Sequence, residues 1–152
     1  MLVVDDEPEI ADLMRAMLES AGYEVATAES GAVALELLEA ARFDVIVSDL
    51  RMPDMDGAQL WREIRDRQPG LARRMLFVTG DTLSPSARSF LDQAGCGSLD
   101  KPFSQDELLA RMQAEGRNLG VWAQGEIAAL VRDHDPVLIP VATYERWFVE
   151  KL

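Results

Sequence analysis

Short apolar runs and amphipathic segments alternate along the first 115 residues of the sequence. The apolar runs predict strands at residues 1–4, 23–28, 43–49, 74–79 and 95–100. After the first run, apolar residues recur at i, i+3, i+4, i+7 and i+8, from Ile10 to Leu18, which is typical of a helix that buries one face. An amphipathic segment follows each of the other runs as well. Strands that alternate with helices imply right-handed crossovers and a parallel sheet. We therefore predict an α/β fold: a doubly wound five-stranded parallel sheet with helices on both faces.

Capping and turn residues agree with these elements. Gly22 follows the first amphipathic segment and can close its helix. Ser84 and Pro85 provide a helix cap followed by a proline at the first helical position. Ser104 and Glu107 have the spacing of a capping box. Residues 45–47 are apolar without alternation, which indicates a strand covered on both faces.

The last 37 residues, 116–152, differ from the rest because residues 1–115 carry nearly all of the acidic excess. We predict a domain over 1–115 and an extension over 116–152 that forms a helix, a short extended segment and a final helix. The extension is too short for a separate output domain. Its aromatic residues, which include Trp122, Trp147 and Phe148, either cover the domain's own surface or form an interface with a partner.

Charge and composition exclude several classes of function. The chain has 15 Lys and Arg residues against 27 Asp and Glu residues, a formal net charge of −12. It would therefore repel the phosphate backbone of nucleic acids, and we expect no direct contact with them. No apolar run approaches the roughly 20 residues that cross a bilayer, and we expect no leader before the first strand. We expect a cytoplasmic protein without membrane contact, in which the single cysteine, Cys96, forms no intramolecular disulfide.

Candidate chemical groups gather at the predicted carboxyl ends of the strands, where doubly wound sheets bind their ligands. Asp5 and Asp6 follow the first strand, and Asp49 ends the third. Three carboxylates in one crevice resist ionising together unless a cation lies among them, and Mg²⁺ prefers such oxygen ligands. Thr79 ends the fourth strand and Lys101 follows the fifth. A hydroxyl and an ammonium beside a metal indicate phosphoryl transfer to a carboxylate.

Four motifs carry a resemblance to a known family. They are VVDDEP at 3–8, SDLRMPDMDG at 48–57, VTG at 78–80 and DKPF at 100–103. In order and spacing they resemble the receiver domain of two-component response regulators over about residues 1–115. Residues 78–85 and 99–103 look most like receivers of hybrid sensor histidine kinases. Two readings stay open, a stand-alone receiver and a part of such a kinase. The resemblance implies a flavodoxin-like fold with strand order 2-1-3-4-5.

The resemblance also implies roles for the acidic residues. Asp49 would be the phosphoacceptor and would attack a phosphohistidine as nucleophile. Asp5, Asp6 and Asp49 would hold Mg²⁺, together with the backbone carbonyl of Arg51.

Three further residues would handle the phosphoryl group. The resemblance implies that Lys101 pairs with the phosphoryl oxygens and that Thr79 swings its hydroxyl toward them. Gly80 would leave room for the group and donate its amide. A cis bond between Lys101 and Pro102 is expected from the family, since X-Pro bonds adopt cis at low cost.

Two features depart from the family or tune its chemistry. Ser98 stands three residues before the lysine, where the family usually has a Tyr or Phe that turns inward on activation. We therefore expect any signal to run through Thr79, its loop and the surface of the helix that follows. Alternatively, the domain only passes the phosphoryl group onward and needs no large change. In the family, two positions often tune how fast the phosphoryl group is lost by hydrolysis. In this sequence they are Arg51 and Asp81. Their opposite charges suggest a pair across the crevice that obstructs the attacking water.

The implied partner is a sensor histidine kinase or a phosphotransfer domain. A homodimer through the fifth strand and its two adjoining helices, or through the extension, stays open. The alternative function is a receiver-like binding scaffold that uses its acidic crevice or its extension without being phosphorylated. We do not expect an enzyme in the usual sense, because the implied chemistry is self-phosphorylation and slow self-dephosphorylation.

Overall fold

The computed structural model describes residues 1–80 and 84–119, with side chains as far as Met112. Its five strands form one sheet in the order β2-β1-β3-β4-β5, and all four pairings are parallel. The strands are β1 (Leu2–Val4), β2 (Ala26–Ala28), β3 (Ile46–Asp49), β4 (Met75–Thr79) and β5 (Gly97–Asp100). The predicted fold class and strand order are confirmed.

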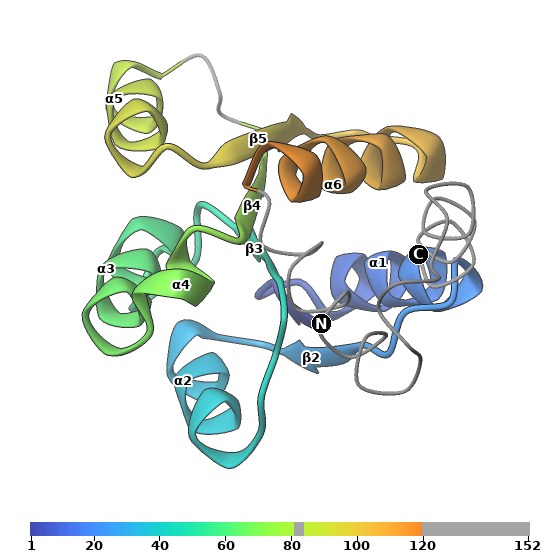
Figure 1. Cartoon of the computed structure of the whole chain (residues 1–152), viewed down its shortest axis with the longest axis horizontal. Coiled ribbons are helices and arrows are strands. Elements are labelled where there is room, and N and C mark those ends of the chain that lie inside the picture. The colour runs from blue at the N-terminus through green and yellow to red at the C-terminus, as the bar shows by residue number, and fades with distance from the viewer. Residues whose placement is uncertain (81–83, 120–152) are drawn as a thin grey trace, which may run out of the picture.

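Helices cover both faces of the sheet (Figure 1). They are α1 (Pro8–Ser20), α2 (Gly31–Ala40), α3 (Gly57–Arg67), α4 (Pro69–Ala72), α5 (Pro85–Ala94) and α6 (Gln105–Leu119). Within the described residues no helix is long and apolar enough to cross a membrane.

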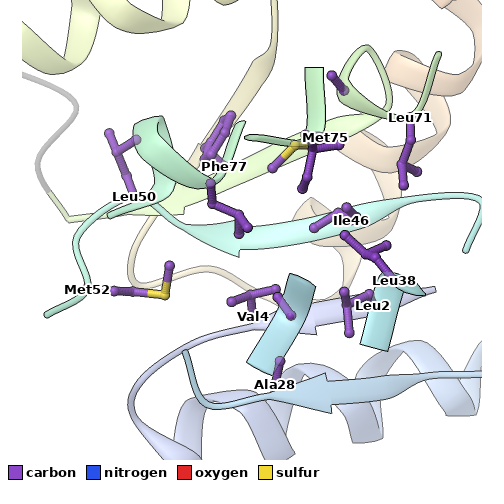
Figure 2. Packing of buried hydrophobic residues seen from close by; sticks show 14 of the residues in the cluster. Leu2, Val4, Ala28, Leu38, Ile46, Leu50, Met52, Leu71, Met75 and Phe77 are labelled. Atoms are coloured by element: carbon purple, nitrogen blue, oxygen red, sulfur yellow. The ribbon is translucent and has the colours of Figure 1, made fainter. Parts of the chain in front are cut away.

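Alternate residues of the buried strands point to opposite faces and build two cores. One core joins Ile46 and Phe77 of the sheet to α2, α3, α4 and α5 (Figure 2). The other joins Val47 and Val78 to α1 and α6. Burial on both faces explains why the central strands read as continuous apolar runs.

The helix starts follow the capping signals of the sequence. The Ala87 amide donates to Ser84 Oγ over 3.1 Å at the start of α5. Ser104 and Glu107 exchange hydrogen bonds of 2.9 and 3.2 Å before α6, so the predicted capping box is confirmed. Gly22 has a positive φ of 96° just after α1, in agreement with its predicted role.

A second, single-turn helix follows α3 directly. Helix α3 ends at Arg67, and Pro69 begins α4. Proline is favoured at the first helical position because its missing amide would have no helical partner there. The Trp61 indole of α3 donates to the Ala72 carbonyl over 3.2 Å and holds the two helices together.

The C-terminal predictions mostly lie outside the described residues. Helix α6 continues through residue 115 to Leu119. The division into 1–115 and 116–152 stays a prediction, as do the roles given to Trp122, Trp147 and Phe148.

Gly57 sets how closely α3 approaches the end of β3. A Cβ at Gly57 would lie 2.7 Å from the Asp49 carbonyl oxygen, 2.9 Å from Leu50 Cα and 3.0 Å from Phe77 Cε1. The Gly57 amide donates to the Leu50 carbonyl over 2.9 Å. The backbone around Asp49 is therefore pinned by a residue that has no side chain.

We expect Gly57→Ala to lower the free energy of unfolding by about 1–3 kcal/mol, because two of the blocking atoms belong to the backbone and cannot rotate away. Gly70→Ala is the matched control, since its Cβ would meet nothing closer than Arg74 Nη2 at 3.8 Å. Alanine is the better helix former at both positions. Urea unfolding checks this, and equal stability of the two variants would show that the close approach is not fixed.

Candidate functional site

Three carboxylates meet at the carboxyl end of the sheet. Asp5 directly follows β1, and Asp49 ends the neighbouring strand β3. One carboxylate oxygen from each of Asp5, Asp6 and Asp49 lies within 4.8 Å of the other two. The exposed fraction is 0% for Asp5 and 6% for Asp49, so these charges have little access to solvent. The structure thus brings together the acids that the sequence singled out.

Lys101 supplies the opposing charge. Its Nζ lies 3.1 Å from Asp5 Oδ2 and 3.4 Å from Asp49 Oδ2. The Lys101 amide donates to the Thr79 carbonyl over 3.0 Å, which ties the end of β5 to the end of β4. The Lys101-Pro102 bond is cis, as expected.

The backbone orients two of the carboxylates. The Glu7 amide donates to Asp5 Oδ1 over 2.9 Å. The Arg51 amide donates to Asp49 Oδ1 over 3.3 Å. Each carboxylate therefore uses one oxygen for a turn amide and directs the other toward Lys101.

Burial and nearby charge act in opposite directions on this cluster. Burial raises the pKa of Asp49 and the Asp5 carboxylate adds to that rise, while Lys101 and the Arg51 amide only partly offset it. Burial also opposes the charge on Lys101, but Asp49 and Asp5 outweigh it and raise the pKa of the lysine. The Lys101 ammonium is thus held in its charged form. For Asp49, the nearby positive charge offsets only part of the cost of ionising the buried carboxyl. An added cation would complete the balance.

Thr79 and Gly80 lie at the end of β4, next to Asp49. Asp49 pairs in register with Val78, so Thr79 follows immediately on the neighbouring strand. Thr79 is buried, whereas Gly80 is exposed and a Cβ there would meet no atom within 4 Å. Open space therefore lies beside Gly80, and its role toward a ligand group stays a prediction.

The residues that depart from the family pattern are placed only in part. Ser98 is half-buried on β5 and pairs in register with Phe77. Arg51 has an exposed side chain. Asp81 lies outside the described residues, so its pairing with Arg51 stays a prediction.

Sequence reasoning missed three residues that shape the loop over residues 50–56, between β3 and α3. Ser48 is fully buried, and its hydroxyl donates to the Asp49 carbonyl over 2.9 Å. Asp56 and Gln59 form a capping box that starts α3 directly after the loop. The Gln59 amide donates to Asp56 Oδ1 over 2.8 Å, and the Asp56 amide donates to Gln59 Oε1 over 3.1 Å. The Asp-x-x-Gln spacing could have revealed the box, whereas nothing in the sequence signals the Ser48 hydrogen bond.

The donor set of the cluster suits a hard divalent ion. Carboxylate oxygens are the ligands that Mg²⁺ prefers, and Mg²⁺ is usually held by one or two carboxylates with waters and phosphate oxygens. Asp6 is less buried than Asp5 and Asp49, so the cluster is open on one side.

Comparison with known proteins identifies the class to which this fold and site belong. The family model described as response regulator receiver domain matches residues 1–113. The chain therefore belongs to the receiver domains of two-component response regulators.

Relatives of this chain are regulators and a kinase of two-component systems. It is 41% identical to the transcriptional regulatory protein GlrR of Escherichia coli over 108 residues. This aligned part covers 71% of this chain and 24% of GlrR. It is 34% identical to the probable transcriptional regulatory protein TcrX of Mycobacterium tuberculosis over 89% of this chain and 59% of TcrX. The sensor kinase CckA of Brucella abortus is 39% identical over 71% of this chain and 11% of CckA. The chain thus spans only part of the length of these relatives.

Solved structures agree. The chemotaxis protein CheY4 of Vibrio cholerae matches with a TM-score of 0.68 and 38% identity over 74% of this chain and 94% of CheY4. The response regulator TrrA of Thermotoga maritima, solved in complex with Mg²⁺ and BeF, matches with a TM-score of 0.65 and 31% identity over 75% of this chain and 96% of TrrA.

We expect Asp49→Asn to raise the melting temperature of the Mg²⁺-free protein at pH 7 by roughly 2–6 °C. Folding raises the pKa of Asp49, so the ionisation of Asp49 weakens the folded state, and this penalty develops as pH rises above the ordinary carboxyl range. The hydrogen bond from Lys101 to Asp5 does not involve Asp49, so we expect the variant to keep it.

Calorimetric or fluorescence melting checks this prediction, with Asp92→Asn as the control because Asp92 is exposed on α5. Added Mg²⁺ should raise the melting temperature of the unsubstituted protein more than that of Asp49→Asn. A variant that melts below the unsubstituted protein without Mg²⁺ would contradict the assigned penalty.

Proposed function

We propose that Asp49 accepts a phosphoryl group from the phosphohistidine of a sensor histidine kinase or a phosphotransfer domain, in a reaction that requires Mg²⁺. The observation that carries this proposal is the cluster of three carboxylates within 4.8 Å, two of them bound by one lysine ammonium. Family membership and the Mg²⁺ and BeF complex of TrrA support it.

The reaction is a nucleophilic displacement at phosphorus. A carboxylate oxygen of Asp49 forms a bond to phosphorus while the bond from phosphorus to the histidine nitrogen breaks, and the bonding electrons stay on the imidazole. The product is an acyl phosphate on Asp49 and a free histidine on the partner. The reacting oxygen must be ionised, which the neighbouring ammonium of Lys101 favours.

Asp5, Asp6 and Asp49, with the backbone carbonyl of Arg51, are the groups we assign to the metal. When bound, Mg²⁺ would neutralise the carboxylates and the charge that builds up on the phosphoryl oxygens. The clustering of the three carboxylates supports their assignment. The part of the Arg51 carbonyl rests on the resemblance alone.

Lys101, Thr79 and Gly80 are the groups we assign to the phosphoryl oxygens. Lys101 would move from the Asp49 carboxylate to a phosphoryl oxygen and keep its contact with Asp5. The Thr79 hydroxyl and the Gly80 amide would donate to the remaining oxygens. The open space beside Gly80 supports its role.

The phosphorylated domain would act through protein contacts in the cytoplasm, where kinases have access to ATP. It would lose its phosphoryl group slowly to water and would turn over no external substrate. The alternative, a scaffold that is never phosphorylated, gains no support from the site. A scaffold has no need of carboxylates whose burial opposes their charge.

We expect intact-mass spectrometry to show one added phosphoryl group after incubation with acetyl phosphate and Mg²⁺, and none on Asp49→Asn. Asp54→Asn is the matched control, because Asp54 lies exposed in the same loop and should leave the adduct intact. A mass shift that persists in Asp49→Asn would assign the acceptor to another residue, and no adduct with Mg²⁺ bound would favour the scaffold.

Arg51→Ala should shorten the lifetime of the Asp49 phosphate, because we assign the Arg51 side chain, paired with Asp81, to the obstruction of the attacking water. The decay of the adduct over time measures this lifetime. Arg62→Ala, a change at a neighbouring exposed arginine, is expected to leave the lifetime unchanged. An unaltered lifetime in Arg51→Ala would count against the tuning pair.

A further inference from the structure

The loop over residues 50–56, which we call the β3–α3 loop, contains a strained turn. The Met55 amide donates to the Pro53 carbonyl over 2.8 Å, which closes a three-residue γ-turn. Asp54, at the centre of the turn, has a positive φ of 66°. A γ-turn with positive φ is rare, because a side chain is crowded in the left-handed region. Such a turn persists only when contacts outside it hold it in place.

Met55 makes a contact of this kind with the first residue of α2. A Cβ at Gly31 would lie 2.7 Å from Met55 Sδ, 2.9 Å from its Cγ and 3.0 Å from its Cβ. Gly31 is buried, and the half-buried Met55 packs against the core to which α2 contributes. The side chain of Met55 therefore lies directly against the helix backbone, in a place that is open because residue 31 is glycine.

The segment that leads to Gly31 also contacts the other half of the acidic cluster. Three residues before Gly31, the Ala28 carbonyl at the end of β2 accepts the Asp5 amide hydrogen over 3.1 Å. Between them, Ser30 caps α2 with its hydroxyl. Residues 28–31 thus form a short hydrogen-bonded junction that touches both the chain at Asp5 and the β3–α3 loop. The junction fixes one of these segments relative to the other.

We propose that Met55 is a positioning residue of the metal site. Through Gly31 it holds the β3–α3 loop in the position that the Arg51 carbonyl needs as a ligand of the ion. The thioether itself is no ligand, because soft sulfur suits Mg²⁺ poorly. The proposal rests on the proposed function, which assigns the metal. Loss of a side chain that keeps a ligand in place lowers metal affinity even though every ligand is still present.

Two other side chains of the loop offer a competing explanation. Leu50 and Met52 are more than nine-tenths buried in the core and anchor the first part of the loop. Met55 follows the strained turn, so its contact acts on the part of the loop that comes after these anchors. If Leu50 and Met52 alone set the position of the loop, loss of the Met55 side chain leaves Mg²⁺ binding unchanged.

The test is a Mg²⁺ titration of the full chain without a phosphodonor, followed by amide NMR spectra that also show whether each variant is folded. We expect Met55→Ala to weaken Mg²⁺ binding about 10-fold. The volume-conserving Met55→Leu should keep most of the affinity. Met17→Ala is the matched control, because Met17 is also half-buried but packs against the other core. It should lower stability and leave Mg²⁺ affinity unchanged.

Gly31→Ala tests the same contact from the other side, and it decides the question if Met55→Ala does not fold. Its added Cβ displaces the Met55 side chain, so Mg²⁺ binding should weaken although alanine favours a helix. In the double variant with Met55→Ala, the two atoms nearest to that Cβ, Sδ and Cγ, are removed. The two changes together should therefore weaken binding by less than the product of their separate effects.

Three results would overturn the proposal: unchanged Mg²⁺ binding in Met55→Ala, equal weakening in Met17→Ala, or independent effects of Gly31→Ala and Met55→Ala. A failure of the proposed function looks different. An unsubstituted chain that binds no Mg²⁺ would refute both proposals. A chain that binds Mg²⁺ but takes no phosphoryl group from acetyl phosphate would refute the receiver chemistry and leave the role of Met55 standing.

Discussion

The structure depends on how the buried charges of Asp5 and Asp49 are balanced. Two carboxylates with almost no access to water repel each other and lose hydration, which is costly without compensation. One ammonium, that of Lys101, lies within 3.4 Å of both. It compensates them only in part, since the pKa of Asp49 stays raised. This incomplete balance suits a divalent cation, which in the proposed reaction would offset the charge of the carboxylates and of the incoming phosphoryl group.

The parallel sheet makes this arrangement possible. Carboxyl ends of neighbouring strands lie at one edge, so residues from distant parts of the chain meet without any long loop. Around them three features that take no part in the reaction hold the backbone in place. They are the close approach of α3 at Gly57, the hydrogen bond of the Ser48 hydroxyl and the helix cap at Asp56. Such support matters because nucleophilic displacement is sensitive to small errors in the position of the attacking atom.

The sequence predicted where strands end better than where they begin. The predicted ends at residues 4, 28, 49, 79 and 100 coincide with those of the structure, because charged or small residues interrupt the apolar runs there. The predicted strand starts come too early, because apolar residues before a strand can also pack into a core. Phe43 and Val45 do so before β3 begins. The acids, Thr79 and Lys101 were found from their places at strand ends. Gly57 and Ser48 were not assigned roles, because a close backbone approach and a hydrogen bond to a neighbouring carbonyl exist only in three dimensions.

The hydrogen bond between Lys101 and Asp5 joins residues 96 positions apart in the chain. Proteins are synthesised from the N-terminus, so Asp5 leaves the ribosome long before its counterion exists. Until Lys101 emerges, burial of Asp5 beside Asp49 is opposed by uncompensated charge. The charge balance of this sheet edge is therefore completed only once residue 101 has been added, and a chain interrupted before it lacks the ammonium that contacts both Asp5 and Asp49.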